Sequence, residues 1–152
     1  PGLRMGYMAL PPELVDAFTR ARSILDGHTP QTRQLTLARF MGDGHYGTHI
    51  RAMRKLYATR QAVMLDALDA CLGEVVTPLR PPGGMQIPCF LKAGWSEAQT
   101  IRQAAGVGVH LPGLSRLYLG EDKQPGWLLG YACLTEHEIE TAILALARAL
   151  KA

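Results

Sequence analysis

Residues 44–73 read GHYGTHIRAMRKLYATRQAVMLDALDACLG, and this stretch predicts the longest helix of the chain. Apolar side chains recur along it at a spacing that places them on one helix face: Ile50, Met53, Tyr57, Met64 and Leu68. Such a stripe indicates a face that packs against other elements. Gly73 is a natural stop, because glycine commonly follows the last residue of a helix. We therefore predict one helix from about residue 46 to residue 72.

Upstream of this helix, the sequence predicts a short strand and two further helices. Residues 3–10 have a strand-like pattern, and Pro11 and Pro12 close the segment. No neighbouring segment offers a hairpin partner for this strand, although a strand needs one to satisfy its backbone groups. Pro12 suits the first position of a helix that ends at Gly27, and Thr29 with Pro30 begins a second helix that ends before residues 42–44.

Downstream of Gly73 the hydrophobic period changes, and strands alternate with helices. We predict strands over residues 74–79, 85–91, 107–111 and 127–134. Residues 85–91 alternate in polarity, as half-buried strands do. Residues 96–99 (SEAQ) and 135–138 (TEHE) have the pattern of capping boxes, so each predicts the start of a helix. The order of elements indicates an α/β fold whose last part is a small α+β domain.

The composition is that of a globular protein. The chain has 152 residues, of which 47% are hydrophobic and 19% charged, which suits a single domain and excludes a disordered chain. No apolar run is long enough to span a membrane. Cys71, Cys89 and Cys133 are widely spaced, so we expect free thiols in a reducing, cytoplasmic environment and neither a disulfide framework nor a zinc site.

Positive charge is concentrated in one region. The chain carries a net charge of +3, yet residues 20–60 contain eight basic and two acidic residues, which leaves +6 in that stretch. Such a region can face phosphates, an anionic cofactor or nucleic acid. The commoner explanation of such a region is the solvated face of helices, and both interpretations stay open.

Few side chains form a constellation with chemical potential. His45 and His49 are four residues apart, as two metal ligands on one helix face would be, but no third ligand is evident. Polar residues at a helix start are the stronger explanation for this pair. Arg4 lies on the first predicted strand between glycines, where the backbone can approach an anion such as a phosphate.

Taken together, several motifs resemble a known family. PGLRMGY at residues 1–7 and LPPEL at 10–14 resemble the segment that follows the cofactor lysine of fold-type I aminotransferases, most closely in the MocR group of GntR-family transcriptional regulators. The resemblance continues through residues 34–40, the GHYxxHxRxMRxxY pattern from Gly44 to Tyr57 with Arg60, and residues 105–107, 115–119 (SRLYL), 129–132 (LGYA) and 134–136.

The resemblance implies a C-terminal fragment of a fold-type I aminotransferase-like protein that binds pyridoxal 5′-phosphate (PLP). Arg4 matches the family's arginine that pairs with the PLP phosphate. Arg116 in SRLYL resembles an arginine that holds the carboxylate of an effector. The Schiff-base lysine of the family is expected upstream of Pro1, so no catalytic residue is assigned here and the chain by itself is expected to be inactive. No metal is expected.

The same resemblance implies an organisation and partners. Residues 1–12 would be the last strand of a truncated large domain, residues 13–72 the connecting helices, and residues 73–152 the small subdomain. The intact protein would be a homodimer that senses an amine or amino acid and binds DNA through an N-terminal winged-helix domain. The alternatives are a fragment of a genuine aminotransferase and a stand-alone basic binding module. Related enzymes often carry an arginine in the strand where residues 126–130 read GWLLG, which weakens the case for ordinary transamination.

Overall fold

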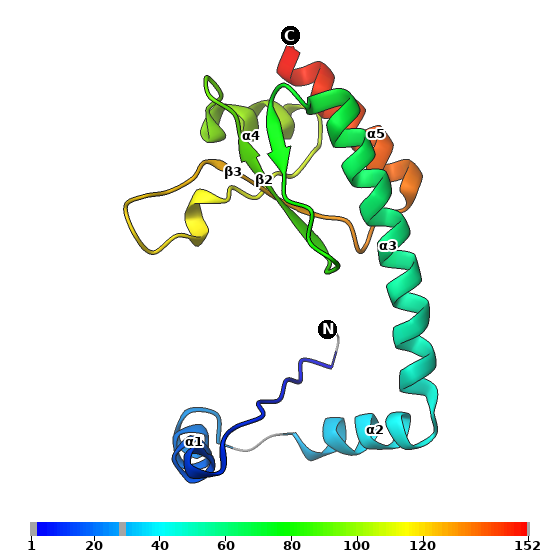
Figure 1. The fold of residues 1–152 in the computed structure, drawn as a ribbon, viewed down its shortest axis with the longest axis vertical. Coiled ribbons are helices and arrows are strands. Elements are labelled where there is room, and N and C mark those ends of the chain that lie inside the picture. Colours follow the sequence, from blue (N-terminus) through cyan, green and yellow to red (C-terminus); the bar gives the residue numbers. More distant parts are fainter. Residues whose placement is uncertain (1–2, 28–29, 152) are drawn as a thin grey trace. The chain divides into compact units, whose positions relative to one another are not determined.

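The computed structural model describes residues 3–27 and 30–151. Pro1, Gly2 and Thr29, which belong to predicted segments, lie outside the described residues. The packing divides the chain into two compact units, Pro1–Ile50 and Arg51–Ala152. The elements are labelled in Figure 1, and each unit is described by itself.

The first unit contains α1 (Pro12–Leu25), α2 (Gln31–Gly42) and the start of α3 (His45–Leu72). These elements confirm the helices that the sequence predicts in this part of the chain. The strand predicted over residues 3–10 was wrong, because the described part of this segment has no regular secondary structure. None of the strands of the described sheet pairs with it, and an unpaired segment cannot form the hydrogen bonds that define a strand.

The second unit is built on a three-stranded antiparallel sheet in the order β1 (Val76–Pro78), β2 (Gln86–Leu91) and β3 (Gly126–Gly130). Val76 pairs with Leu91 in the first register, and Cys89 pairs with Trp127 in the second. The alternation predicted for β2 is confirmed, since Ile87 and Cys89 are buried and Gln86 is exposed.

The strand predicted over residues 107–111 was wrong. Gly108 has a φ of 76° and turns the chain, and the Val109 N–H donates to the Ala104 carbonyl at the end of a helix. The backbone donors needed for a ladder are therefore used elsewhere. The residues just after this segment approach β3. They form an isolated bridge between Gly113 and Trp127, with one backbone hydrogen bond on each side of it. β3 also ends at Gly130, before the predicted residue 134.

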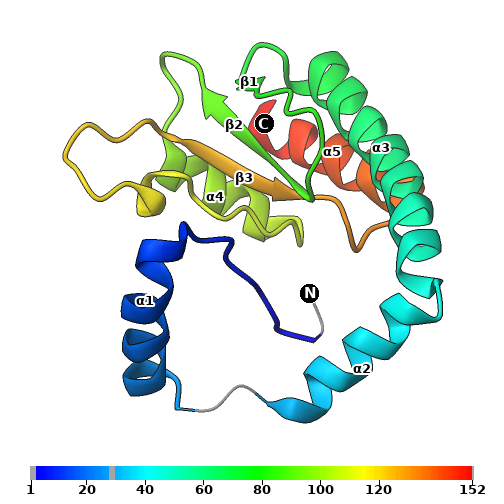
Figure 2. The same ribbon diagram turned by 60° about the horizontal axis from the view of Figure 1, so that its bottom comes forward.

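The second half of α3, α4 (Glu97–Gly106) and α5 (Glu136–Lys151) surround the core of this unit. Figure 2 shows α4 and α5 on one face of the sheet, with α3 running beside α5. Sheet and helices meet in a buried apolar cluster that includes Met64, Leu68, Leu72, Ile87, Cys89, Trp127, Leu129, Tyr131, Ile139, Ile143 and Leu146. Fully burying one such side chain contributes roughly 1.5–3 kcal/mol, so this unit has a substantial core.

The start of α5 has the capping box that the sequence predicts. The Glu138 N–H donates to Thr135 Oγ1 over 3.3 Å, and the Thr135 N–H donates back to Glu138 Oε2 over 2.7 Å. At the start of α4, Ser96 Oγ accepts from the Gln99 N–H over 3.4 Å. Each cap satisfies backbone donors that a helix start leaves unpaired.

The core of the second unit begins earlier in the chain than the small subdomain that the sequence predicts. The second unit begins inside α3, because the last turns of that helix supply Met64, Leu68 and Leu72 to the core. The small subdomain predicted at residues 73–152 has a later boundary, and that division of the intact protein stays a prediction.

Candidate ligand-binding site

Arg116 lies on a short turn beside the edge of β3. Ser115–Leu117 forms one turn of 3₁₀-helix, closed by a hydrogen bond from the Leu117 N–H to the Leu114 carbonyl over 3.0 Å. The buried Leu114 anchors the turn, and its N–H donates to the Gly126 carbonyl over 2.8 Å. Arg116 is exposed, and in the described part of the chain its guanidinium has no ion pair or hydrogen bond. The turn therefore presents a cation that can receive an anion.

Glu97, the first residue of α4, holds this turn in place. Its Oε1 accepts from Ser115 Oγ over 2.5 Å, and its Oε2 accepts from the Ser115 N–H over 3.1 Å and from the Gly126 N–H over 2.7 Å. One carboxylate thus joins the start of α4, the arginine-bearing turn and the start of β3. A capping box explains Ser96 and Gln99, but no pattern in the sequence shows that Glu97 contacts residues 18 and 29 positions further along.

The electrostatics of Glu97 match its role as an acceptor. Burial by itself would raise the pKa of this carboxyl, but the hydrogen bonds from the Ser115 hydroxyl and from the Gly126 and Ser115 N–H groups outweigh it, so the pKa lies below its usual value. A Cβ at position 113 would lie 2.5 Å from Glu97 Oε1, so a residue larger than glycine there would displace the carboxylate. Backbone and carboxylate therefore approach closely on this side of the turn.

β3, which reads GWLLG, is the strand in which related enzymes often carry an arginine, and it contains leucines instead. Trp127 and Leu129 are buried, whereas Leu128 is half-buried. Because side chains alternate along a strand, Leu128 lies on the sheet face opposite its two neighbours. An apolar side chain on this strand provides no partner for a ligand carboxylate, so Arg116, the arginine that the family-like SRLYL motif indicates, stays the candidate for that role.

Arg4 is exposed and has an unusual backbone. Its φ is 51°, in the left-handed region that non-glycine residues rarely adopt. Such a conformation costs of order 1 kcal/mol and persists when the surroundings require it, often at binding sites. The carbonyl of Leu3 accepts a 3.4 Å hydrogen bond from Arg33, while the Arg4 guanidinium has no partner among the described residues. A Cβ at Gly6 would meet open space, so this side is accessible.

Arg4 and Arg116 belong to different units, so the structure describes each of them separately. Each arginine by itself has the features of an anion-binding residue, because its guanidinium is exposed and its hydrogen-bond donors are available. Their roles toward a cofactor and an effector stay predictions.

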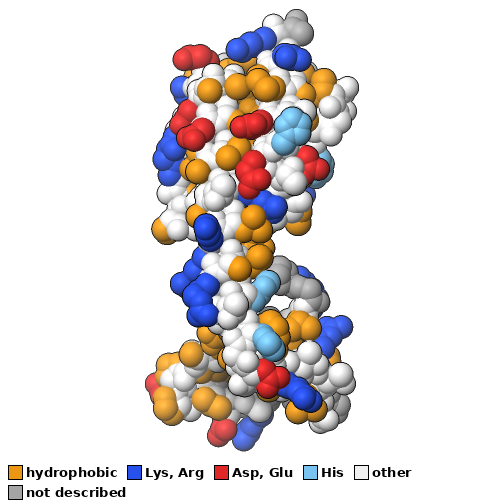
Figure 3. Space-filling model, turned by 90° about the vertical axis from the view of Figure 1, so that its right-hand side faces the viewer, with side chains coloured by type: hydrophobic (Ala, Val, Ile, Leu, Met, Phe, Trp, Pro, Cys, Tyr) orange, Lys and Arg blue, Asp and Glu red, His pale blue; other side chains and the backbone are white. Residues whose placement is uncertain are grey.

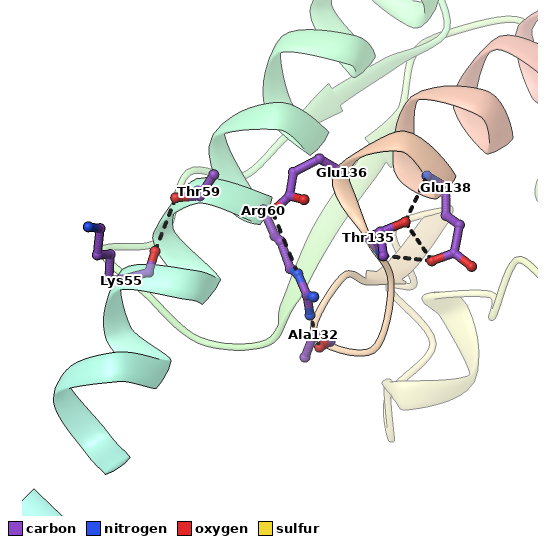
Figure 4. A network of polar contacts seen from close by, with 7 residues as sticks. All are labelled: Lys55, Thr59, Arg60, Ala132, Thr135, Glu136 and Glu138. Atoms are coloured by element: carbon purple, nitrogen blue, oxygen red, sulfur yellow. Dashed lines mark hydrogen bonds and ion pairs between the residues drawn. The ribbon is translucent and has the colours of Figure 1, made fainter. Parts of the chain in front are cut away.

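Arg60 has a structural role that the sequence did not specify. Its side chain is 15% exposed, its Nη1 donates to the Ala132 carbonyl over 2.6 Å, and its Nε lies 3.9 Å from Glu136 Oε1 (Figure 4). The arginine therefore connects α3 to the loop that leads from β3 into α5. The only signal for it was its place at the end of the family-like motif.

Most of the basic region of residues 20–60 is solvent-facing. Its other basic residues are exposed: Arg20, Arg22, Arg33, Arg39, Arg51, Arg54 and Lys55. Figure 3 shows Lys and Arg side chains gathered along the part of the molecule formed by α3. His45 and His49 each contact the ring of Phe40, with centroids 5.8 and 6.4 Å apart. These contacts give the two histidines a packing role at the start of α3.

No described helix is both long enough and apolar enough to cross a membrane.

No protein-family model matches the chain. The comparison with solved structures, in contrast, gives a clear result. The α-aminoadipate aminotransferase LysN of Thermus thermophilus, solved with N-(5′-phosphopyridoxyl)-L-leucine, matches 99% of this chain and 39% of its own with a TM-score of 0.90 and 28% identity. The kynurenine aminotransferase of Pyrococcus horikoshii matches 99% of this chain and 37% of its own, with a TM-score of 0.89 and 28% identity.

The chain therefore has the fold of part of a fold-type I aminotransferase, which confirms the predicted α/β class. The curated relatives of this chain include transcriptional regulators as well as an enzyme. The probable rhizopine catabolism regulatory protein MocR of Rhizobium meliloti is 35% identical over 100% of this chain, and the HTH-type transcriptional regulator YhdI of Bacillus subtilis is 34% identical over 96%. The 2-aminoadipate transaminase of Thermus thermophilus is 28% identical over 99%.

The chain fits the C-terminal, aminotransferase-like region of a MocR-type regulator, as the motifs predicted. It spans 31% of the length of each of these two regulators.

Proposed function

We propose that this chain is the C-terminal part of the PLP-binding, aminotransferase-like effector domain of a cytoplasmic, DNA-binding transcriptional regulator. The observation that carries the proposal is the similarity to three HTH-type regulators at 32–35% identity over nearly the whole chain, against 28% for the transaminase. The leucines of β3 support it, because related enzymes often carry an arginine in this strand and its absence weakens the case for ordinary transamination.

Arg4 would hold the phosphate of PLP. Its exposed guanidinium can donate paired, charge-assisted hydrogen bonds to phosphate oxygens. When bound, PLP supplies an aldehyde that reacts with primary amines. The lysine that carries it would belong to the segment before Pro1. Arg116 would receive the carboxylate of an amino-acid effector, and Leu128 would border that ligand with an apolar surface.

The partners follow from the same proposal. The intact protein would form a homodimer, respond to an amine or amino acid, and bind DNA through an N-terminal winged-helix domain. A genuine aminotransferase is the alternative, supported by the similarity to the Thermus transaminase along nearly all of this chain. The reading frame upstream of Pro1 separates the two, since a winged-helix domain favours a regulator.

The decisive experiment uses the intact protein. We expect it to bind the DNA upstream of its own gene in a fluorescence anisotropy assay, and we expect an amino acid added with PLP to change that affinity. Rapid transfer of amino groups between amino and keto acids, without DNA binding, would establish the aminotransferase alternative. Salt-sensitive DNA binding by residues 1–152 alone would instead favour a basic binding module.

Arg4→Gln tests the cofactor role. We expect it to raise the apparent Kd for PLP in the intact protein at least about tenfold, since hydrogen bonds to charged groups contribute about 1.5–3 kcal/mol. Arg20→Gln is the matched control, because Arg20 is an exposed arginine of α1 in the same unit. Equal PLP affinity in both variants would refute the assignment of Arg4.

A further inference from the structure

Arg116 lies on a turn that is too short to define its own geometry. A single turn of 3₁₀-helix has few internal hydrogen bonds, and Ser115–Leu117 is followed by exposed residues from Leu119 to Pro125. An arginine that binds a carboxylate through two parallel hydrogen bonds must be held at a defined place and angle. Leu114, the residue before the turn, is anchored by its hydrogen bond to β3, and a further contact is needed at Ser115, directly beside the arginine.

We propose that Glu97 supplies this contact and is a positioning residue for Arg116. The proposal rests on the proposed role of Arg116 in binding a ligand carboxylate. Two of the hydrogen bonds to the Glu97 carboxylate fix both the backbone and the hydroxyl of Ser115, the residue directly before Arg116. The third, from the Gly126 N–H, ties the same carboxylate to β3.

Two further features show that this contact is built into the fold. Gly113 provides the space for the carboxylate, since any Cβ there would overlap Glu97 Oε1. The start of α4 is fixed in turn by the cap at Ser96, so Glu97 projects from a rigid element.

The charge balance also favours this arrangement. Glu97 has three donors around its two oxygens, and none of them comes from Arg116. The carboxylate therefore orders the turn without neutralising the arginine, whose donors stay available for a ligand. A carboxylate closer to Arg116 would compete with the ligand for the same guanidinium.

The test compares two probes on the apo form of the intact protein. One is N-(5′-phosphopyridoxyl)-L-leucine, the adduct present in the LysN structure. The other is N-(5′-phosphopyridoxyl)-3-methylbutylamine, which differs only in lacking the carboxylate. The ratio of their two Kd values, measured by calorimetry, isolates the contribution of the carboxylate. General damage to the fold weakens both probes alike and leaves the ratio unchanged.

We expect Arg116→Gln to reduce the preference for the carboxylate probe at least about tenfold, the size of a charged hydrogen-bonded contact. Glu97→Ala should reduce it about fivefold or more, because misplaced binding groups lose much of their contribution. In the Arg116→Gln background, Glu97→Ala should have no further effect on the ratio. Glu97→Gln, which keeps one acceptor oxygen, should fall between Glu97→Ala and the wild type.

Glu140→Ala is the control, since Glu140 is an exposed glutamate of α5 and should leave the ratio unchanged. An unchanged ratio in Glu97→Ala, with a reduced ratio in Arg116→Gln, overturns the positioning role alone. An unchanged ratio in Arg116→Gln overturns the proposed role of Arg116. Absence of binding by both probes to the wild type overturns the proposed cofactor site, and the positioning role with it.

Discussion

The buried hydrogen bond between Thr100 and Trp127 offers a direct test of how the second unit is held together. Both residues have a relative exposure of 0%, and Trp127 Nε1 donates to Thr100 Oγ1 over 3.0 Å. The bond links α4 to β3 in the core. Thr100→Val removes the acceptor with little change of shape, and it leaves the indole N–H buried without a partner.

The structure determines which hydrogen bond is lost. The Thr100 hydroxyl also donates to the carbonyls of Ser96 and Glu97, but the Ser96 carbonyl still accepts from the Thr100 N–H over 3.0 Å. Valine and threonine have similar helix propensities, so the unpaired indole N–H dominates the cost. Leaving a buried donor unsatisfied costs about 1–3 kcal/mol.

Urea denaturation of the purified chain, followed by circular dichroism at the helical minimum, measures this cost. With a slope of about 1–3 kcal/mol per molar urea for a small protein, we expect a decrease in midpoint of about 1 M. Thr59→Val is the matched control, because Thr59 is exposed on α3 and its hydroxyl likewise donates to the carbonyl four residues earlier, that of Lys55. We expect its effect to stay within about 0.5 kcal/mol.

A double-mutant cycle with Trp127→Phe completes the test. If the hydrogen bond is the main contribution, Thr100→Val should cost much less in the Trp127→Phe background, where no donor remains. A midpoint for Thr100→Val equal to that of Thr59→Val, or a cost that is the same in both backgrounds, would show that this hydrogen bond does not stabilise the second unit.

Three further predictions concern buried and titrating groups. Tyr131→Phe should raise the free energy of unfolding by about 1 kcal/mol, because the Tyr131 hydroxyl is buried and has no hydrogen-bond partner among the described residues; a clear loss of stability would contradict this. Burial raises the pKa of the Cys89 thiol to about 12, so Ellman's reagent at pH 8 should label the exposed Cys133 first and Cys89 only after denaturation. Because the folded-state pKa of Glu97 lies below its usual value, its contribution to stability should be present above the unfolded pKa and be lost as the pH falls through the folded pKa. Glu97→Gln should therefore reduce the loss of stability on acidification, and an unchanged pH profile would count against the Glu97 network.

Local patterns predicted the helices well. Caps and glycine stops involve residues only a few positions apart, so they act through local backbone geometry, and the apolar stripe is visible as a periodic spacing within one segment. The starts of α4 and α5 and the end of α3 at Leu72 were predicted for this reason. The resemblance to the regulators came from short motifs in a fixed order, and it too could be found without a structure.

Local sequence patterns were therefore sufficient to predict the helices, the α/β class and the likeness to the regulators. Which segments pair and which side chains meet became known only from the folded structure. It showed that residues 3–10 form no strand, that residues 107–111 turn away from the sheet, and that Glu97 and Arg60 each join distant segments. The physical reason is the same in each case. Strand pairing and long-range hydrogen bonds depend on the partner that folding brings alongside, and that partner leaves no mark in the local sequence.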